Sequence, residues 1–183
     1  MKTISRTLTL IFAVVATSAA KPAEVTPLTL PGSEAIVFRK VGETELRLHV
    51  VKPKGWAKQD VRPCLVSFFG GGWNSGTPES SIRWAKWAAA NNMLGVAPDY
   101  RTRDRLKGTP EDCVSDGRAA VAWIVEHAKE LGIDPKKIVV LGGSAGGHIA
   151  AWTAIFAAWN SFWPSVSVSH GTACPTSSGP ILF

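Results

Sequence analysis

The fold of this chain is decided by residues 138–147, which read Ile-Val-Val-Leu-Gly-Gly-Ser-Ala-Gly-Gly. A short, continuous apolar run bounded by breakers is typical of a strand buried on both faces of a parallel sheet. The glycine-rich turn leads into residues 149–158, which are rich in Ala, Ile and Trp and predict a helix. A buried strand that turns directly into a helix indicates an α/β fold.

The turn itself has the pattern G-x-S-x-G, formed by Gly142, Ser144 and Gly146. In such a turn the serine adopts a strained conformation that lifts its Oγ above the sheet edge, and larger side chains at the flanking glycines would collide. Phosphate-binding loops do not fit. A P-loop requires Lys where His148 stands, and a dinucleotide fingerprint requires glycine at position 144. The pattern therefore predicts Ser144 as a nucleophile.

A second glycine turn, Phe69-Gly70-Gly71-Gly72-Trp73, follows the apolar run 64–68. Glycine lets this backbone approach a substrate closely. The amides of Gly71 and Gly72, together with the Ala145 amide at the start of the predicted helix, are the predicted donors of an oxyanion hole. Trp73 is a candidate wall of an acyl pocket.

Further strands and helices extend in both directions from these turns. Apolar or alternating runs predict strands at 35–39, 45–51, 64–68, 94–97 and 138–141. Periodic apolar residues predict helices at 79–90 and 109–131. Thr109 is a good N-cap of the second helix, and Pro110 suits its first position. We therefore expect an α/β fold with a mainly parallel sheet and an antiparallel N-terminal hairpin.

The same periodicity assigns individual side chains to the core or the surface. Apolar and polar residues alternate in 45–51, which places His49 on a solvated face. The helical patterns predict mostly core positions for three tryptophans, Trp84, Trp87 and Trp123. Asp99 is interpreted as a residue at a strand end, and Asp116 as a residue on a helix.

Composition excludes several classes of protein. The chain has 183 residues, of which 45% are hydrophobic and 19% charged, so it is not a disordered chain of low hydrophobicity. The net charge of +6 arises from bases interspersed with acids, and we expect no nucleic-acid partner. The three cysteines lack CxxC spacing, which argues against a zinc or thioredoxin-like motif. Cys64 and Cys113 are expected to be small core residues.

Residues 1–20 have the pattern of a secretory signal peptide. Lys2 and Arg6 form the positive region, 8–16 form the apolar region, and small residues precede a cleavage site after Ala20. The apolar run is shorter than the roughly 20 residues of a membrane span. We therefore expect export to the periplasm or the outside, with no stable membrane span once the signal is removed. An uncleaved N-terminal anchor is the alternative.

The two glycine turns, together with Asp99-Tyr100-Arg101 and residues 131–135, resemble the α/β-hydrolase superfamily, in particular hormone-sensitive-lipase-like carboxylesterases and acetylxylan or feruloyl esterase-like enzymes. The resemblance implies ester hydrolysis through an acyl-enzyme on Ser144, without metal or cofactor. It implies a small ester or an acylated polysaccharide as substrate, and indicates no oligomeric state. One departure is Phe69, because the family usually has His there, and the hydrogen bonds by which that His holds the loop are lost.

The family's triad continues from the serine to an acid and then a histidine. No Asp, Glu, Lys or Arg follows Lys137, so neither the acid nor its histidine is identifiable. His148 is interpreted as a structural residue of the following helix, and His170 as an exposed tail residue. The alternative function is therefore an inactive, truncated hydrolase fragment.

The expected organisation is a signal peptide at 1–20, a lead-in at 21–33, the N-terminal part of an α/β-hydrolase domain at 34–158, and an uncharged tail at 159–183. The family's later strands are not recognisable in this tail. Their absence would expose a sheet edge and apolar surface, from which we expect poor solubility.

Overall fold

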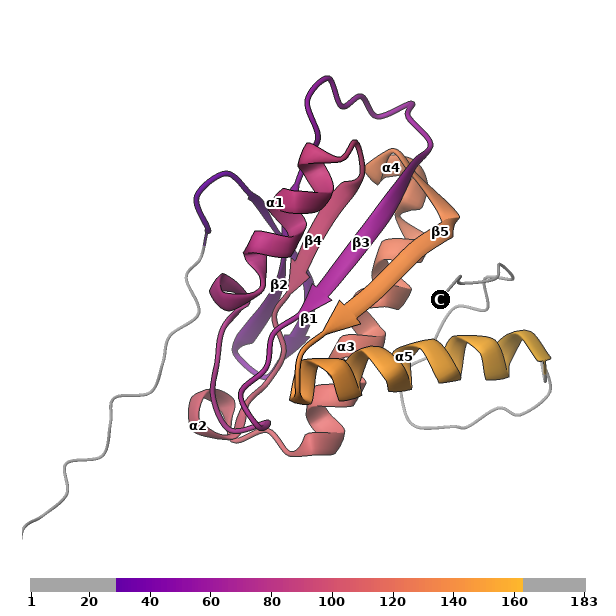
Figure 1. Ribbon diagram of the computed structural model, residues 1–183. Helices are drawn as coiled ribbons and strands as arrows, with labels where there is room; N and C mark the ends of the chain where they lie inside the picture. Colours follow the sequence, from indigo (N-terminus) through magenta and orange to yellow (C-terminus); the bar gives the residue numbers. More distant parts are fainter. Residues whose placement is uncertain (1–28, 163–183) are drawn as a thin grey trace, which may run out of the picture.

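The computed structural model describes residues 29–162, with side chains described up to residue 155 (Figure 1). The predicted signal peptide, most of the lead-in and the tail beyond residue 162, with Cys174 and His170, lie outside the described residues. The elements in chain order are β1 (Glu34–Val41), β2 (Thr44–Val51), β3 (Arg62–Phe68), η1 (Pro78–Ser80), α1 (Ile82–Ala90), β4 (Leu94–Pro98), α2 (Arg103–Leu106), α3 (Pro110–Glu126), α4 (Ala128–Leu131), β5 (Ile133–Gly142) and α5 (Ala145–Phe162).

The strands form one sheet in the order β1-β2-β4-β3-β5. β1 pairs antiparallel with β2, and β2 pairs antiparallel with β4, whereas β3 is parallel to both β4 and β5. At the centre, Val66 lies in register with Val96 on one side and Val140 on the other. The α/β class and the N-terminal hairpin are confirmed. The sheet is mixed, and β4, β3 and β5 form its parallel part.

Helices cover both faces of this sheet. α1 contacts β3 and β4, and its Ile82 packs with Val51 and Ala97 in a small cluster. α3 and α5 contact each other, and Ile124 and Ile149 of these helices belong to the main core. Side chains alternate between the faces of a strand, so neighbouring residues of one strand reach different clusters.

The carboxyl ends of the parallel strands meet at one edge of the sheet. Three segments start there: the glycine turn after β3, the segment 99–109 after β4 and the turn after β5 (Figure 1). In open α/β sheets ligands bind at this edge.

Several element boundaries differ from the sequence prediction. The helix predicted at 109–131 breaks at His127 into α3 and α4. β5 begins at Ile133, earlier than expected, because Arg62 of β3 pairs with this residue beyond a register shift. α5 continues to Phe162, past the expected boundary at residue 158.

Three side-chain predictions were wrong. His49 is fully buried, because β2 is an inner strand and the face predicted to be solvated also carries the small cluster under α1. Trp84 and Trp87 are 42% and 53% exposed, because small and branched residues fill the buried stripe of α1, namely Ile82, Ala85 and Ala88. The core positions of Cys64 and Cys113 are confirmed, and both thiols are free.

Candidate active site

Ser144 lies on the sharp turn that joins β5 to α5. It is exposed and has a φ of 54°, a left-handed conformation that L residues adopt rarely. The flanking glycines are required sterically. A Cβ on Gly142 would lie 2.3 Å from the carbonyl group of Gly146, and a Cβ on Gly146 would lie 2.4 Å from the carbonyl oxygen of Phe69. The local geometry is that of a strained nucleophile elbow.

The two glycine turns lie directly against each other. A Cβ on Gly70 would be 2.8 Å from the Gly143 carbonyl oxygen and 3.6 Å from the Ser144 Cβ. The predicted oxyanion donors Gly71 and Gly72 follow in the same exposed turn, with φ values of 143° and 59°. The structure thus brings together the predicted nucleophile and the predicted loop of donors, although 69–73 and 142–147 are far apart in sequence.

The third predicted donor, Ala145, is the first residue of α5 and is buried. Amides in the first turn of a helix have no intrahelical acceptor, and the helix dipole favours negative charge at this end. The next amides are engaged locally: Gly146 donates to the Gly143 carbonyl and His148 donates to the Ser144 carbonyl, both at 3.0 Å. The Ala145 amide therefore lies where an oxyanion donor is expected, directly after the predicted nucleophile and at the start of α5.

His148 lies one turn of α5 after the serine, and its ring faces two indoles. The Trp152 Nε1 donates to the His148 Nε2 at 2.9 Å, and the Trp73 ring makes an edge contact with the imidazole at 5.5 Å between centroids. This environment agrees with a structural role. It also places Trp73 next to the elbow.

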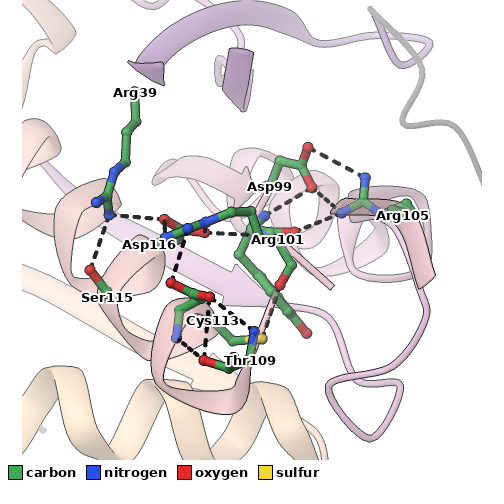
Figure 2. Close-up of polar contacts among 10 residues, drawn as sticks. Arg39, Asp99, Arg101, Arg105, Thr109, Cys113, Ser115 and Asp116 are labelled. Carbon is green, nitrogen blue, oxygen red and sulfur yellow. Dashed lines mark hydrogen bonds and ion pairs between the residues drawn. The ribbon is translucent and has the colours of Figure 1, made fainter. Parts of the chain in front are cut away.

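The two buried acids near the sheet edge are paired with arginines (Figure 2). Asp116 of α3 accepts from the backbone amide and the guanidinium of Arg101 and forms an ion pair with Arg39 of β1. Asp99, directly after β4, pairs with Arg105 at 2.6 Å. The expected positions of Asp99 at a strand end and Asp116 on a helix are confirmed.

We call residues 69–76, the glycine turn after β3 and the residues that follow it, the oxyanion turn. A pocket of about 360 Å³ opens beside it. Its wall combines the end of that turn with α2 and the start of α3, namely Gly72, Trp73, Asn74, Arg103, Lys107, Gly108, Thr109 and Pro110. Among residues 29–155, no group of three His, Cys, Asp or Glu side chains is placed to hold a metal ion. No helix within the described residues is long and apolar enough to cross a membrane.

A parallel strand that turns through a strained serine into a helix, beside a glycine turn after the neighbouring strand, defines the α/β-hydrolase class. The sequence model of the family described as BD-FAE matches residues 48–171. The chain belongs to this family, and the resemblance to α/β-hydrolase carboxylesterases is confirmed.

Individual relatives agree with this assignment. An AB hydrolase superfamily protein of Schizosaccharomyces pombe is 37% identical over 107 residues, which cover 56% of this chain and 30% of that protein. Carboxylesterase NlhH of Mycobacterium tuberculosis is 35% identical over 115 residues, which cover 60% of this chain and 34% of that protein. The chain thus spans about a third of the length of these two relatives.

A solved esterase from Thermogutta terrifontis has a similar structure. It is 45% identical, with a TM-score of 0.65, and the likeness covers 66% of this chain and 43% of that one. The same esterase has also been solved phosphorylated by paraoxon. The fold and the class of hydrolase are thus supported by sequence and by structure.

Proposed function

We propose that this chain hydrolyses carboxylic esters through Ser144. The observation that carries the proposal is the contact between the two glycine turns, which sets the serine beside the loop that holds Gly71 and Gly72. The Ser144 Oγ attacks the ester carbonyl carbon, and the amides of Gly71, Gly72 and Ala145 stabilise the oxyanion. The C–O bond to the alcohol then breaks, and the alcohol leaves with one proton. Water then attacks the acyl-enzyme, the acyl group leaves as the carboxylic acid, and the Ser144 hydroxyl is restored.

Among the described residues, the His148 ring nitrogen accepts from an indole and the buried acids are paired with arginines, so none of these groups is arranged as a base for Ser144. Without a base, catalysis falls to what the oxyanion hole and binding provide, roughly 10³- to 10⁴-fold over water. We therefore propose slow acylation of Ser144 for this stretch of chain. The alternative function, a hydrolase fold that binds esters without turnover, is supported by the same observation.

Acylation of Ser144 can be tested with a fluorophosphonate probe and with p-nitrophenyl acetate. We expect intact-mass labelling of the wild type at one site, a release of p-nitrophenolate, and loss of both in Ser144→Ala. Ser75→Ala, at an exposed serine of the oxyanion turn, is the matched control and should label like the wild type. Labelling without release of p-nitrophenolate favours the non-catalytic alternative, and equal labelling of the wild type and Ser144→Ala would rule out the nucleophile.

The substrate class and the location are part of the same proposal. We propose small esters, with acetyl or feruloyl groups on polysaccharide as the natural form, and export directed by residues 1–20. Expression in a Gram-negative host followed by N-terminal sequencing should give a mature chain that begins at Lys21. A full-length cytoplasmic product would contradict export.

A further inference from the structure

The oxyanion turn is held by the segment that follows β4, residues 99–107. Three backbone carbonyls of the turn accept hydrogen bonds from this segment. The Tyr100 hydroxyl donates to the Phe69 carbonyl at 2.6 Å. The Arg103 amide donates to the Trp73 carbonyl at 3.0 Å, and the Asp104 amide donates to the Asn74 carbonyl at 2.8 Å.

These three carbonyls lie on both sides of residues 70–72, whose amides include two of the predicted oxyanion donors. The Phe69 ring adds a further contact, because it stacks on the Tyr100 ring at 3.9 Å between centroids with an angle of 9° between planes. Both rings are buried. The turn is thus fixed before and after its glycines by one continuous segment.

The segment 99–107 is itself anchored firmly (Figure 2). The Arg105 guanidinium has 3% of its side chain exposed and donates to the Asp99 carboxylate at 2.6 Å and to the Tyr100 carbonyl at 2.7 Å. The Asp99 carboxylate also accepts from the Tyr100 amide at 2.9 Å. Arg101 donates to the buried carboxylate of Asp116 on α3, so the anchor reaches a long helix.

From this arrangement we propose that Tyr100 and the amide of Arg103 are positioning residues for the oxyanion hole, which hold the Gly71 and Gly72 amides at the elbow of Ser144. Burial raises the pKa of the Tyr100 hydroxyl, so it stays protonated and donates throughout the working pH range. The loop begins with Phe69. Its backbone is held in place by the ring stacked on Phe69 and, through the segment 99–107, by the buried Arg105–Asp99 pair. This inference rests on the proposed function of the loop.

Two substitutions remove single hydrogen bonds from this arrangement. Tyr100→Phe keeps the stacked ring and removes the hydroxyl. Arg103→Pro removes the amide donor to Trp73 together with the exposed Arg103 side chain. The backbone can accept proline, because Arg103 is the first residue of α2 and Thr102 before it is already extended. Its matched control is Arg103→Ala, which removes the same exposed side chain and keeps the amide.

Hydrogen exchange of backbone amides in the full chain measures directly how firmly the oxyanion turn is held. We expect the amides of 70–76 to exchange at least about fivefold faster in Tyr100→Phe and Arg103→Pro, with Arg103→Ala and the amides of α3 like the wild type. Trp56→Phe is a second control, because it removes one aromatic donor to a backbone carbonyl, that of Leu131, at the opposite edge of the sheet. Exchange at 70–76 unchanged in both test variants overturns the inference.

The chemical readout is the modification of Ser144 by the fluorophosphonate probe. Loss of one oxyanion donor typically costs 10²- to 10³-fold, and a loosened loop should cost less, about tenfold in the maximal rate of modification. The half-saturating probe concentration should not change. A general loss of structure would change this concentration as well as the maximal rate, so the result distinguishes the two causes. A wild type that does not label overturns the proposed function, and the exchange comparison then decides the inference alone. Labelling that stays at the wild-type rate in both test variants overturns the positioning role.

Discussion

The glycines of the elbow are not equivalent, although they are adjacent in sequence. A Cβ on Gly146 would lie 2.4 Å from the Phe69 carbonyl oxygen and 2.5 Å from that of Phe68, both of them backbone atoms. A Cβ on Gly143 would meet nothing within 4 Å, and its φ is not among the positive values. The second glycine of the pattern, Gly146, is thus required by contact between α5 and the end of β3, whereas Gly142 is required by its contact with Gly146.

We predict that Gly146→Ala destabilises the fold by about 2–4 kcal/mol, because the new methyl group must displace backbone. Gly143→Ala, the control in the same turn, should change the free energy of unfolding by less than about 0.5 kcal/mol. Urea unfolding followed by tryptophan fluorescence measures both. Equal stability of the two variants would show that the close approach of α5 to β3 is not rigid.

His49 makes the stability of the fold depend on pH. Neither of its buried ring nitrogens has a hydrogen-bond partner among the described residues. Burial, and secondarily the charge of Arg47, lowers the pKa of this imidazole from 6.5 to about 4. Below pH 6.5 the unfolded chain therefore takes up a proton that the folded chain does not. Stability consequently falls as the pH falls from about 6.5 towards 4.

We expect the wild type to lose about 2 kcal/mol of unfolding free energy from this group between pH 7 and pH 5. His49→Leu should show a flatter dependence over the same range. The variants can be compared by urea unfolding at pH 7, 6 and 5, and a His49→Leu slope equal to that of the wild type would contradict the assignment.

At the scale of elements, α3 is joined to two other parts of the fold by one buried carboxylate. Asp116 has no exposed side-chain surface, and it pairs with Arg101 from the segment after β4 and with Arg39 from β1. We predict that Asp116→Asn costs about 2–4 kcal/mol, because it leaves two arginines without their counter-charge. Asp104→Asn, in an exposed pair with Arg103, should cost less than about 0.5 kcal/mol. Thermal unfolding measures both, and similar melting temperatures would contradict the prediction.

The elements also show what the sequence could predict. The apolar runs at 64–68 and 94–97 identified β3 and β4, since continuous burial leaves a pattern in one short segment. α2 was not predicted, because a four-residue helix with three charged residues has no apolar period. The exposure of Trp84 and Trp87 was missed because the pattern counts apolar residues and does not show which of them the neighbouring strands can accommodate.

The candidate site also has one part that the sequence could predict and one part that it could not. Ser144 and its glycines could be found from local spacing, because the chemistry needs those residues at adjacent positions. The contacts between Tyr100 and Phe69, and between Arg105 and Asp99, could not be found. The first depends on how the segments after β3 and β4 meet at one edge of the sheet, and the second on how residues 99–107 fold back on themselves. Asp99-Tyr100-Arg101 was noticed only as part of a resemblance, with no physical role attached to it.

At the scale of the whole molecule, one side of the described sheet combines an edge strand with exposed apolar side chains. β5 is the edge strand, and Val139 on it is 36% exposed. α5 runs out past β5 (Figure 1). On this helix, 49% of Trp152 and 58% of Ile155 are exposed. Unpaired edges and neighbouring apolar patches favour association between chains.

We therefore predict that the chain self-associates through this side, in agreement with the poor solubility expected from its sequence. The double substitution Trp152→Gln and Ile155→Gln should shift the population towards monomer, measured by sedimentation velocity between about 1 and 50 μM, a range in which weak apolar contacts are partly occupied. Val61→Gln is the control, because Val61 is 69% exposed but lies before β3, at the other end of the parallel strands. If Val61→Gln reduced association as much as the double variant, the contact would lie elsewhere. A wild type that is monomeric at every concentration would show that the edge of β5 and the exposed face of α5 are protected from pairing.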